Sequence, residues 1–173
     1  MAKDYLIDIY YVDDDDLYLN YFRKRFQLDI PYSLYTYNSG KKFLMHYIQD
    51  CKKRRNQKIV IMDYLLKSGD EHNAKTLTEL LPIIKHHNPD TDVIILSRSE
   101  NLNIKPTAGD YTPAAFIKKD DNAFDHISNT IKRFAAKYEL NRRYKQSKDA
   151  TYIFIFVMIG AVLAALVMYF IGS

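Results

Sequence analysis

The chain has 173 residues, 47% of them hydrophobic and 14% aromatic, which is enough for a real core, and a formal net charge of +4. Much of its positive charge lies just before the C-terminal apolar run and in residues 52–58, and neither stretch has the pattern of an RNA-binding sheet or of a DNA-reading helix pair. Nucleic acid is therefore not an expected partner. The lone Cys51 excludes an internal disulfide and fits a reducing compartment.

Short apolar runs alternate with helical patterns from the N-terminus onward. Residues 5–12 (YLIDIYYV) are rich in β-forming types and predict a strand, after which apolar residues recur at helical spacing over 17–26. Residues 32–37 (YSLYTY) alternate as a strand should, and a second helix is predicted over 39–48. A strand followed by a helix therefore occurs twice.

The same alternation continues through the middle of the chain. Residues 59–62 predict a third strand, 76–86 a third helix and 93–96 a fourth strand. Pro82 lies within the helical pattern, so we expect either a kink there or a shorter helix.

The last elements of the predicted domain are less regular. A helix over 102–112 is weakly indicated, because Pro106 and Gly109 interrupt it. Residues 114–117 (AAFI) predict a short fifth strand, and one apolar seam over 124–138 predicts a final amphipathic helix. Five strands alternating with helices predict an α/β fold, a doubly wound parallel sheet with helices on both faces.

Polar side chains gather where these strands end. In such a sheet the ligand lies at the carboxyl ends of the strands. Close carboxylates repel one another unless a cation neutralises them, and oxygen ligands suit Mg²⁺, so the pattern predicts a magnesium site at which Asp63 attacks a phosphoryl group. The residues at the strand ends are Asp13 and Asp14, Asp63, Ser97, and Lys118 with Lys119.

The chain resembles the receiver domain of two-component response regulators over residues 5 to about 138. The matching pieces are VDDD at 12–15, IVIMD at 59–63, PDTDVIILS at 89–97 and AAFIKK at 114–119. The resemblance implies the flavodoxin-like strand order 2-1-3-4-5.

The resemblance also implies residue roles. Asp13 and Asp14, with Asp63, would hold Mg²⁺, and Asp63 would accept a phosphoryl group from a histidine kinase or phosphotransfer protein. Ser97 and Lys119 would contact the phosphoryl group; Lys119 is chosen over Lys118 because it lies three residues beyond the aromatic Phe116, the expected switch residue.

Several positions depart from the family pattern. Arg98 replaces the small residue that usually follows the Ser or Thr, and a long cation there is expected to modulate access to the phosphoryl site by shielding or clamping it. Lys67 stands where a proline is usual.

Three functions follow from these observations. The favoured one is a receiver that is a phosphoacceptor rather than an enzyme, with at most self-phosphorylation or autodephosphorylation, and that signals by protein contact. A pseudo-receiver scaffold without phosphorylation is the alternative, motivated by Arg98 and Lys67. A phosphatase of the haloacid dehalogenase type is a third, but Leu17 occupies the last place of its Asp-x-Asp-x-Thr/Val pattern and no cap domain is evident.

Residues 152–171 (YIFIFVMIGAVLAALVMYFI) form a run without a charged residue, and at helical rise they cover about 30 Å, the hydrocarbon thickness of a bilayer. We therefore predict a receiver domain at 1–138, a basic juxtamembrane helix or linker at 139–150 and a transmembrane helix at 151–171. The basic flank places the domain on the cytoplasmic side of the inner membrane, as a single-pass, tail-anchored protein. Small residues four apart, such as Gly160 and Ala164, would allow two spans to pair as a homodimer.

Overall fold

The computed structural model describes residues 6–53, 56–64, 77–98 and 111–172, and within the last helix it leaves out the side chains of 149–151, 153, 161–170 and 172. Its centre is a five-stranded sheet in which every neighbouring pair is parallel, in the order β2-β1-β3-β4-β5. The predicted fold class and strand order are therefore confirmed. The strands are β1 (Ile7–Val12), β2 (Tyr32–Tyr37), β3 (Gln57–Asp63), β4 (Asp92–Ser97) and β5 (Ala115–Lys118).

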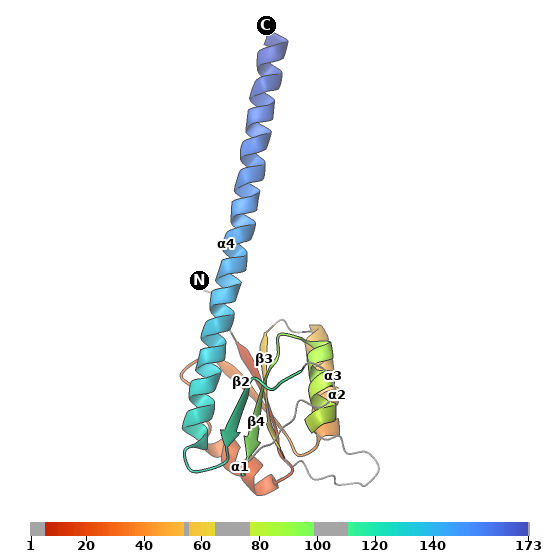
Figure 1. Cartoon of the computed structure of the whole chain (residues 1–173), viewed down its shortest axis with the longest axis vertical. Helices are drawn as coiled ribbons and strands as arrows, with labels where there is room; N and C mark the ends of the chain where they lie inside the picture. The colour runs from red at the N-terminus through yellow and green to blue at the C-terminus, as the bar shows by residue number, and fades with distance from the viewer. Residues whose placement is uncertain (1–5, 54–55, 65–76, 99–110, 173) are drawn as a thin grey trace. The chain divides into compact units, whose positions relative to one another are not determined.

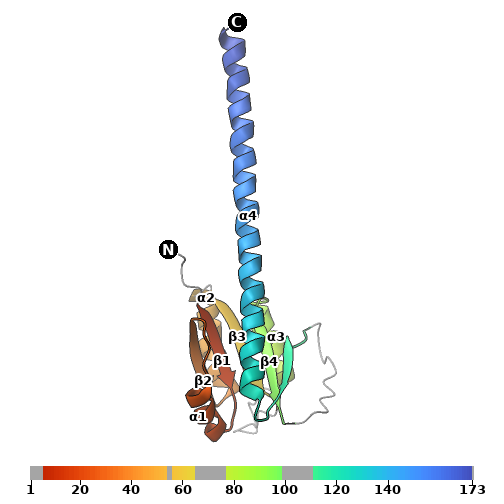
Figure 2. The same cartoon turned by 90° about the vertical axis from the view of Figure 1, so that its left-hand side faces the viewer.

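Helices cover both faces of the sheet (Figures 1 and 2). One face of β1 and its neighbours packs with α1 and the start of α4, and the other with α2 and α3. Both faces of the central strands are thus buried, which is why β1 and β3 read as nearly continuous apolar runs. The helices are α1 (Asp16–Arg25), α2 (Gly40–Lys53), α3 (Leu77–His87) and α4 (Ala123–Gly172).

Two local features explain how helices begin and continue. The Asp15 side chain caps α1 by accepting hydrogen bonds from the backbone N–H groups of Leu17 and Tyr18 at 3.0 and 3.1 Å. Pro82 lies inside α3, and the described residues of the predicted segment, 77–86, are all helical, so the helix does not stop at the proline. The weakly indicated helix over 102–112 lies almost entirely outside the described residues, as does Lys67.

Helix α4 belongs to two compact units, Met1–Ala135 and Ala136–Ser173. Its first turns bury Ala123, Ile127 and Ile131 in the core of the first unit, as the apolar seam predicts. The remainder of α4 is the second unit.

The sequence predicts a transmembrane helix at 151–171, within the second half of α4. Across the parts of the chain that are described, no helix combines the length and the apolar character needed to cross a membrane. The side chains of 161–170, in the predicted span, lie outside those parts.

Candidate functional site

The site lies at the carboxyl edge of the sheet, where four adjacent strands end. Asp13 and Asp14 directly follow β1, and Asp63 is the last residue of β3. Ser97 ends β4, and Lys119 follows β5. The parallel register sets these ends side by side, since Val12 pairs with Met62, Asp63 with Leu96, and Ser97 with Lys118.

The three predicted metal-binding carboxylates lie together. One oxygen from each of Asp13, Asp14 and Asp63 can be chosen so that all three lie within 4.8 Å of one another. Asp13 and Asp63 are buried and Asp14 is half-buried, so water screens their mutual repulsion only in part.

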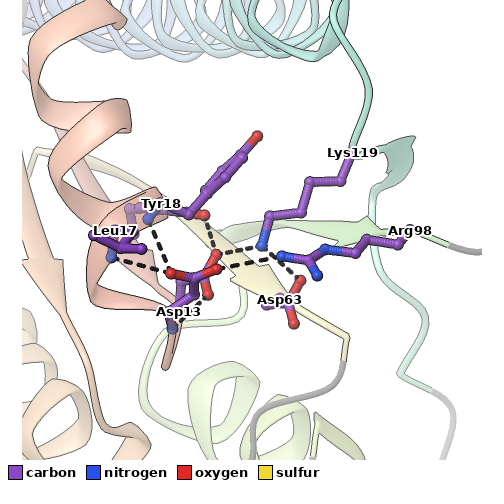
Figure 3. A network of polar contacts seen from close by, with 8 residues as sticks. Asp13, Leu17, Tyr18, Asp63, Arg98 and Lys119 are labelled. Carbon is purple, nitrogen blue, oxygen red and sulfur yellow. Dashed lines mark hydrogen bonds and ion pairs between the residues drawn. The ribbon is translucent and has the colours of Figure 1, made fainter.

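Lys119 supplies positive charge to this cluster (Figure 3). Its Nζ lies 2.6 Å from Asp13 Oδ2 and 3.2 Å from Asp63 Oδ1, and its side chain is only 3% exposed. Lys118, the other lysine of the pair, is exposed on β5. Of the two lysines, the structure brings Lys119 to the carboxylates, as the spacing from Phe116 predicts.

Asp13 is held by donors on both of its oxygens. The Tyr11 hydroxyl donates to Asp13 Oδ2, the same oxygen that Lys119 contacts, and the Asp15 backbone N–H donates to Oδ1 at 3.0 Å. Burial raises the pKa of Tyr11 far above its usual range, and the charge of Asp13 raises it further, so the hydroxyl keeps its proton. The Tyr11 ring stacks on Phe22 at 4.1 Å between centroids, which fixes where the hydroxyl points.

Tyr18 contacts the lysine rather than a carboxylate. Lys119 Nζ lies 4.0 Å from the centroid of the Tyr18 ring, well within the range of a cation–π interaction. Burial raises the pKa of Tyr18 to about 12, with a further contribution from Asp13, so the ring remains neutral at ordinary pH.

Sequence reasoning missed both tyrosines. Tyr11 lies in β1 and Asp13 directly follows that strand, and a spacing of two residues in extended chain places their side chains on the same face, which was the available signal. The Tyr18 contact could not be read in the same way, because it joins two residues that are 101 positions apart and that meet only when the Lys119 side chain reaches Asp13.

Arg98 lies beside the acidic cluster and contacts Asp15 (Figure 3). Its guanidinium donates to Asp15 Oδ2 at 3.3 Å, while its own side chain is 71% exposed. The pKa of Asp15 is held below its usual range, first by the Tyr18 N–H, then by that of Leu17, and to a smaller extent by Lys119 and Arg98. The Arg98 guanidinium therefore lies beside the N-terminal cap of α1.

The two remaining predicted residues lie at the edge of this arrangement. Ser97 is buried, and its carbonyl oxygen accepts a hydrogen bond from the Lys119 backbone N–H at 2.7 Å, which ties the end of β4 to the start of the loop after β5. Phe116 lies on β5 with its side chain 47% exposed. The structure thus puts Ser97 at the site and the Phe116 ring toward solvent.

The donor set fits a hard divalent cation. Three carboxylates and one ammonium give this group of residues a formal charge of −2. All three candidate ligands offer oxygen, which Mg²⁺ and Ca²⁺ prefer over nitrogen and sulfur. The acidic cluster is therefore suited to Mg²⁺ by both charge and ligand type.

Solved structures with the same architecture are receiver domains. A response regulator receiver domain protein from Clostridium thermocellum has a TM-score of 0.58 and 20% identity, covering 78% of this chain and 98% of that one. The fold is that of a receiver domain. The signal receiver domain of an HD domain-containing protein from Pseudomonas fluorescens gives 0.55 and 18%, over 75% of this chain and 94% of that one.

NtrX from Brucella abortus, solved in complex with ATP, gives a TM-score of 0.58 and 22% identity over 80% of this chain and 29% of its own. No protein-family model and no curated protein sequence matches the chain. With identities of 18–22%, the similarity establishes the receiver fold, and the role of each residue must be argued from the site itself.

Proposed function

We propose that this chain is a response regulator receiver that accepts a phosphoryl group on Asp63 from a histidine kinase or phosphotransfer protein, and that it signals by protein contact. The observation that carries the proposal is the position of the Asp63 carboxylate, at the end of β3 beside Asp13, Asp14 and the ammonium of Lys119.

The transfer step uses a carboxylate oxygen of Asp63 as the nucleophile. It attacks the phosphorus of a phosphohistidine, an oxygen–phosphorus bond forms as the phosphorus–nitrogen bond breaks, and the electron pair leaves with the imidazole. Lys119, 3.2 Å from Asp63 Oδ1, is placed to meet the negative phosphoryl oxygens. Mg²⁺, held by Asp13, Asp14 and Asp63, would add positive charge that offsets those oxygens.

Three further residues complete the proposed site. The Ser97 hydroxyl is assigned to the phosphoryl group, because Ser97 ends the strand next to that of Asp63. Phe116 is assigned as the switch residue, since it is an aromatic residue of β5 with an exposed ring, and we expect the ring to turn inward when Ser97 moves. Arg98 modulates access, because it spans to Asp15 beside the site.

The test is phosphorylation of the full chain with acetyl phosphate and Mg²⁺, followed by intact mass. We expect the wild type to gain one phosphoryl group that hydroxylamine removes, as an acyl phosphate requires, and Asp63→Asn to gain none. Asp121→Asn, at an exposed position in the loop after β5 and outside the cluster of three carboxylates, is the matched control and should behave as wild type. A wild type that gains no phosphoryl group, or an Asp63→Asn variant that still gains one, contradicts the proposal.

A pseudo-receiver scaffold is the second candidate, and the Arg98–Asp15 ion pair beside the acidic cluster favours it. Beryllofluoride with Mg²⁺ separates the two, because a phosphoryl mimic should change the backbone NMR signals of Ser97 and Phe116 in a working receiver. If the signals are unchanged in the wild type but change in Arg98→Ala, then Arg98 prevents the phosphoryl mimic from binding or acting.

We also propose that residues 152–171 attach the protein to the inner membrane, with the receiver on the cytoplasmic side. The support is the uncharged run itself and the basic residues that precede it. Wild type should stay with membranes through alkaline extraction, whereas Leu163→Asp should be released, because a carboxylate in the centre of a span costs about 3 kcal/mol. Leu140→Asp, an exposed position before the run, is the control. Release of the wild type would refute membrane attachment and leave the receiver proposal standing.

The histidine kinase or phosphotransfer partner follows from the same proposal, and a homodimer through Gly160 and Ala164 remains a prediction. Crosslinking of the full chain in membranes, compared between wild type and Gly160→Leu, tests the dimer directly. Equal crosslinking in both would argue against pairing through these small residues.

A further inference from the structure

We propose that Tyr18 is a positioning residue for Lys119: the face of its ring holds the lysine ammonium between Asp13 and Asp63, and this placement sets how fast Asp63 accepts a phosphoryl group. The statement about rate rests on the proposed function. The statement about position concerns the resting protein and stands by itself.

Three groups surround the Lys119 ammonium, and together we call them the lysine cage: Asp13, Asp63 and the ring of Tyr18. The two carboxylates contact Nζ at 2.6 and 3.2 Å, and the ring centroid lies 4.0 Å from the same atom (Figure 3). Because the lysine side chain is almost entirely buried, water contributes little to its solvation, and the ring replaces part of the lost hydration.

The Tyr18 ring is itself held in place by the start of α1. Its backbone N–H donates to the capping carboxylate of Asp15 at 3.1 Å, which fixes the first turn of the helix. Its ring lies 6.4 Å from that of Tyr11 and 6.0 Å from that of Tyr21. The Tyr18 ring of the lysine cage is therefore a constrained side chain rather than a mobile one at the surface.

A ring serves this position differently from a third carboxylate. It attracts the ammonium without adding to the formal charge of −2 and without a directional hydrogen bond. The lysine can then pivot from Asp13 toward a phosphoryl group on Asp63 while it remains in contact with the same ring face. A side chain without a π face would leave the ammonium held by Asp13, the closer of its two acidic partners.

The test compares Tyr18→Leu, which removes the ring, with Tyr18→Phe, which keeps the ring and removes only the hydroxyl. Tyr144→Leu is the matched control, because it removes an exposed ring that also contacts a lysine, with Lys148 Nζ 4.7 Å from its centroid, and that belongs to the second compact unit and not to the lysine cage. Urea unfolding of each variant confirms that the assays are run on folded protein.

The first readout is the side-chain NMR signal of Lys119 in the resting protein, assigned by its loss in Lys119→Arg. The ring current of Tyr18 should displace the signals of the lysine ε-methylene group in wild type, Tyr18→Phe and Tyr144→Leu. In Tyr18→Leu the displacement should vanish. A signal that is the same in Tyr18→Leu and wild type overturns the proposal.

The second readout is the rate of acyl phosphate formation on Asp63 from acetyl phosphate with Mg²⁺. For Tyr18→Leu we expect the maximal rate to fall by a factor of about 3 to 10, the range of a partly desolvated cation–π contact, with an unchanged half-saturating acetyl phosphate concentration. Tyr18→Phe and Tyr144→Leu should react at the wild-type rate. A Tyr18→Phe variant as slow as Tyr18→Leu would overturn the proposal, because the hydroxyl and not the ring face would then be responsible.

The two readouts fail separately. A wild type that forms no acyl phosphate overturns the proposed function, and the resting-state spectra then decide the position of Lys119. A displaced lysine signal with equal rates in wild type and Tyr18→Leu confirms the contact and refutes its effect on the reaction.

Discussion

Two buried groups of charges lie at opposite edges of the same sheet, and they are built differently. Near the amino ends of the strands, Asp8 of β1 and Lys58 of β3 are paired in register, with 3.6 Å between Asp8 Oδ2 and Lys58 Nζ and no exposure of either side chain. At the carboxyl ends, three carboxylates meet the single ammonium of Lys119. One group is neutral as a pair, and the other carries excess negative charge.

The partners around the two groups follow the same contrast. Asn56 donates to both carboxylate oxygens of Asp8, at 3.3 and 3.4 Å, and Gln57 donates to Asp92 at 3.2 Å, so the amino edge is satisfied by short polar side chains of the fold. The carboxyl edge instead gathers acidic groups around one point. A buried ion pair with balanced charge is expected to stabilise the fold, whereas a cluster with excess negative charge is suited to bind a cation.

The largest expected effect comes from breaking the neutral pair. Lys58→Met should lower the free energy of unfolding by about 3–5 kcal/mol, because it removes the ammonium that lies 3.6 Å from the fully buried Asp8 carboxylate. Urea denaturation measures the loss, and Mg²⁺ should not restore it. The double variant Asp8→Leu, Lys58→Met should recover most of the loss; a single variant as stable as wild type would show that the pair carries little of the fold.

The matching lysine deletion at the carboxyl edge should behave differently. Lys119→Met removes charge-assisted hydrogen bonds and should cost about 1.5–3 kcal/mol without metal. At a Mg²⁺ concentration ten times the dissociation constant of the variant, the variant should gain about 1.4 kcal/mol and wild type less, since in wild type the Lys119 ammonium already neutralises part of the acidic cluster. Urea denaturation with and without Mg²⁺ tests this, and an equal loss under both conditions would remove the distinction between the two edges.

A smaller effect is expected from relieving the excess charge. Asp14→Asn should raise metal-free stability by about 1 kcal/mol, because it reduces repulsion among three close carboxylates. It should also weaken stabilisation by Mg²⁺. Thermal unfolding in both conditions provides the measurement, with Asp121→Asn as the control. Stabilisation by Mg²⁺ of the same size in Asp14→Asn and wild type would exclude Asp14 as a ligand.

A further effect is expected at alkaline pH. The pKa of Tyr18 is about 12 in the folded chain and about 10 in an unfolded one, so the folded state keeps a proton that the unfolded state loses. Its contribution to stability is therefore complete below pH 10 or so and is lost as the pH rises through about 12. Tyr18→Phe should lose less stability than wild type over this interval in urea titrations at increasing pH. An identical loss would mean that Tyr18 titrates alike in both states.

Much of this arrangement could be predicted from the residues in order. Parallel strands end at one edge, so residues that follow apolar runs, such as Asp13, Asp63 and Lys119, are placed together once the alternation of strands and helices is recognised. The family spacing then chose Lys119 over Lys118, and the contact with both carboxylates agrees with that choice.

Other contacts could not be obtained in this way, for physical reasons. Asp8 and Lys58 are far apart in the chain, and only the pairing of β1 with β3 makes them partners. The Tyr18–Lys119 contact likewise joins residues far apart in the chain, and it forms only because the Lys119 side chain reaches the acidic cluster beside α1. Pro82 shows the opposite case, in which packing of α3 on the sheet overrides a local helix-breaking preference.

The stack of Tyr11 on Phe22, and of Phe22 on Phe26 at 4.7 Å, continues the site into the hydrophobic interior. An engineer who transplanted Asp13, Asp63 and Lys119 onto another receiver would carry over the ionisable groups but not the phenol that donates to Asp13. That donor is aligned by two aromatic side chains of α1 and its C-terminal cap. For this protein, the chemistry and the interior must be redesigned together.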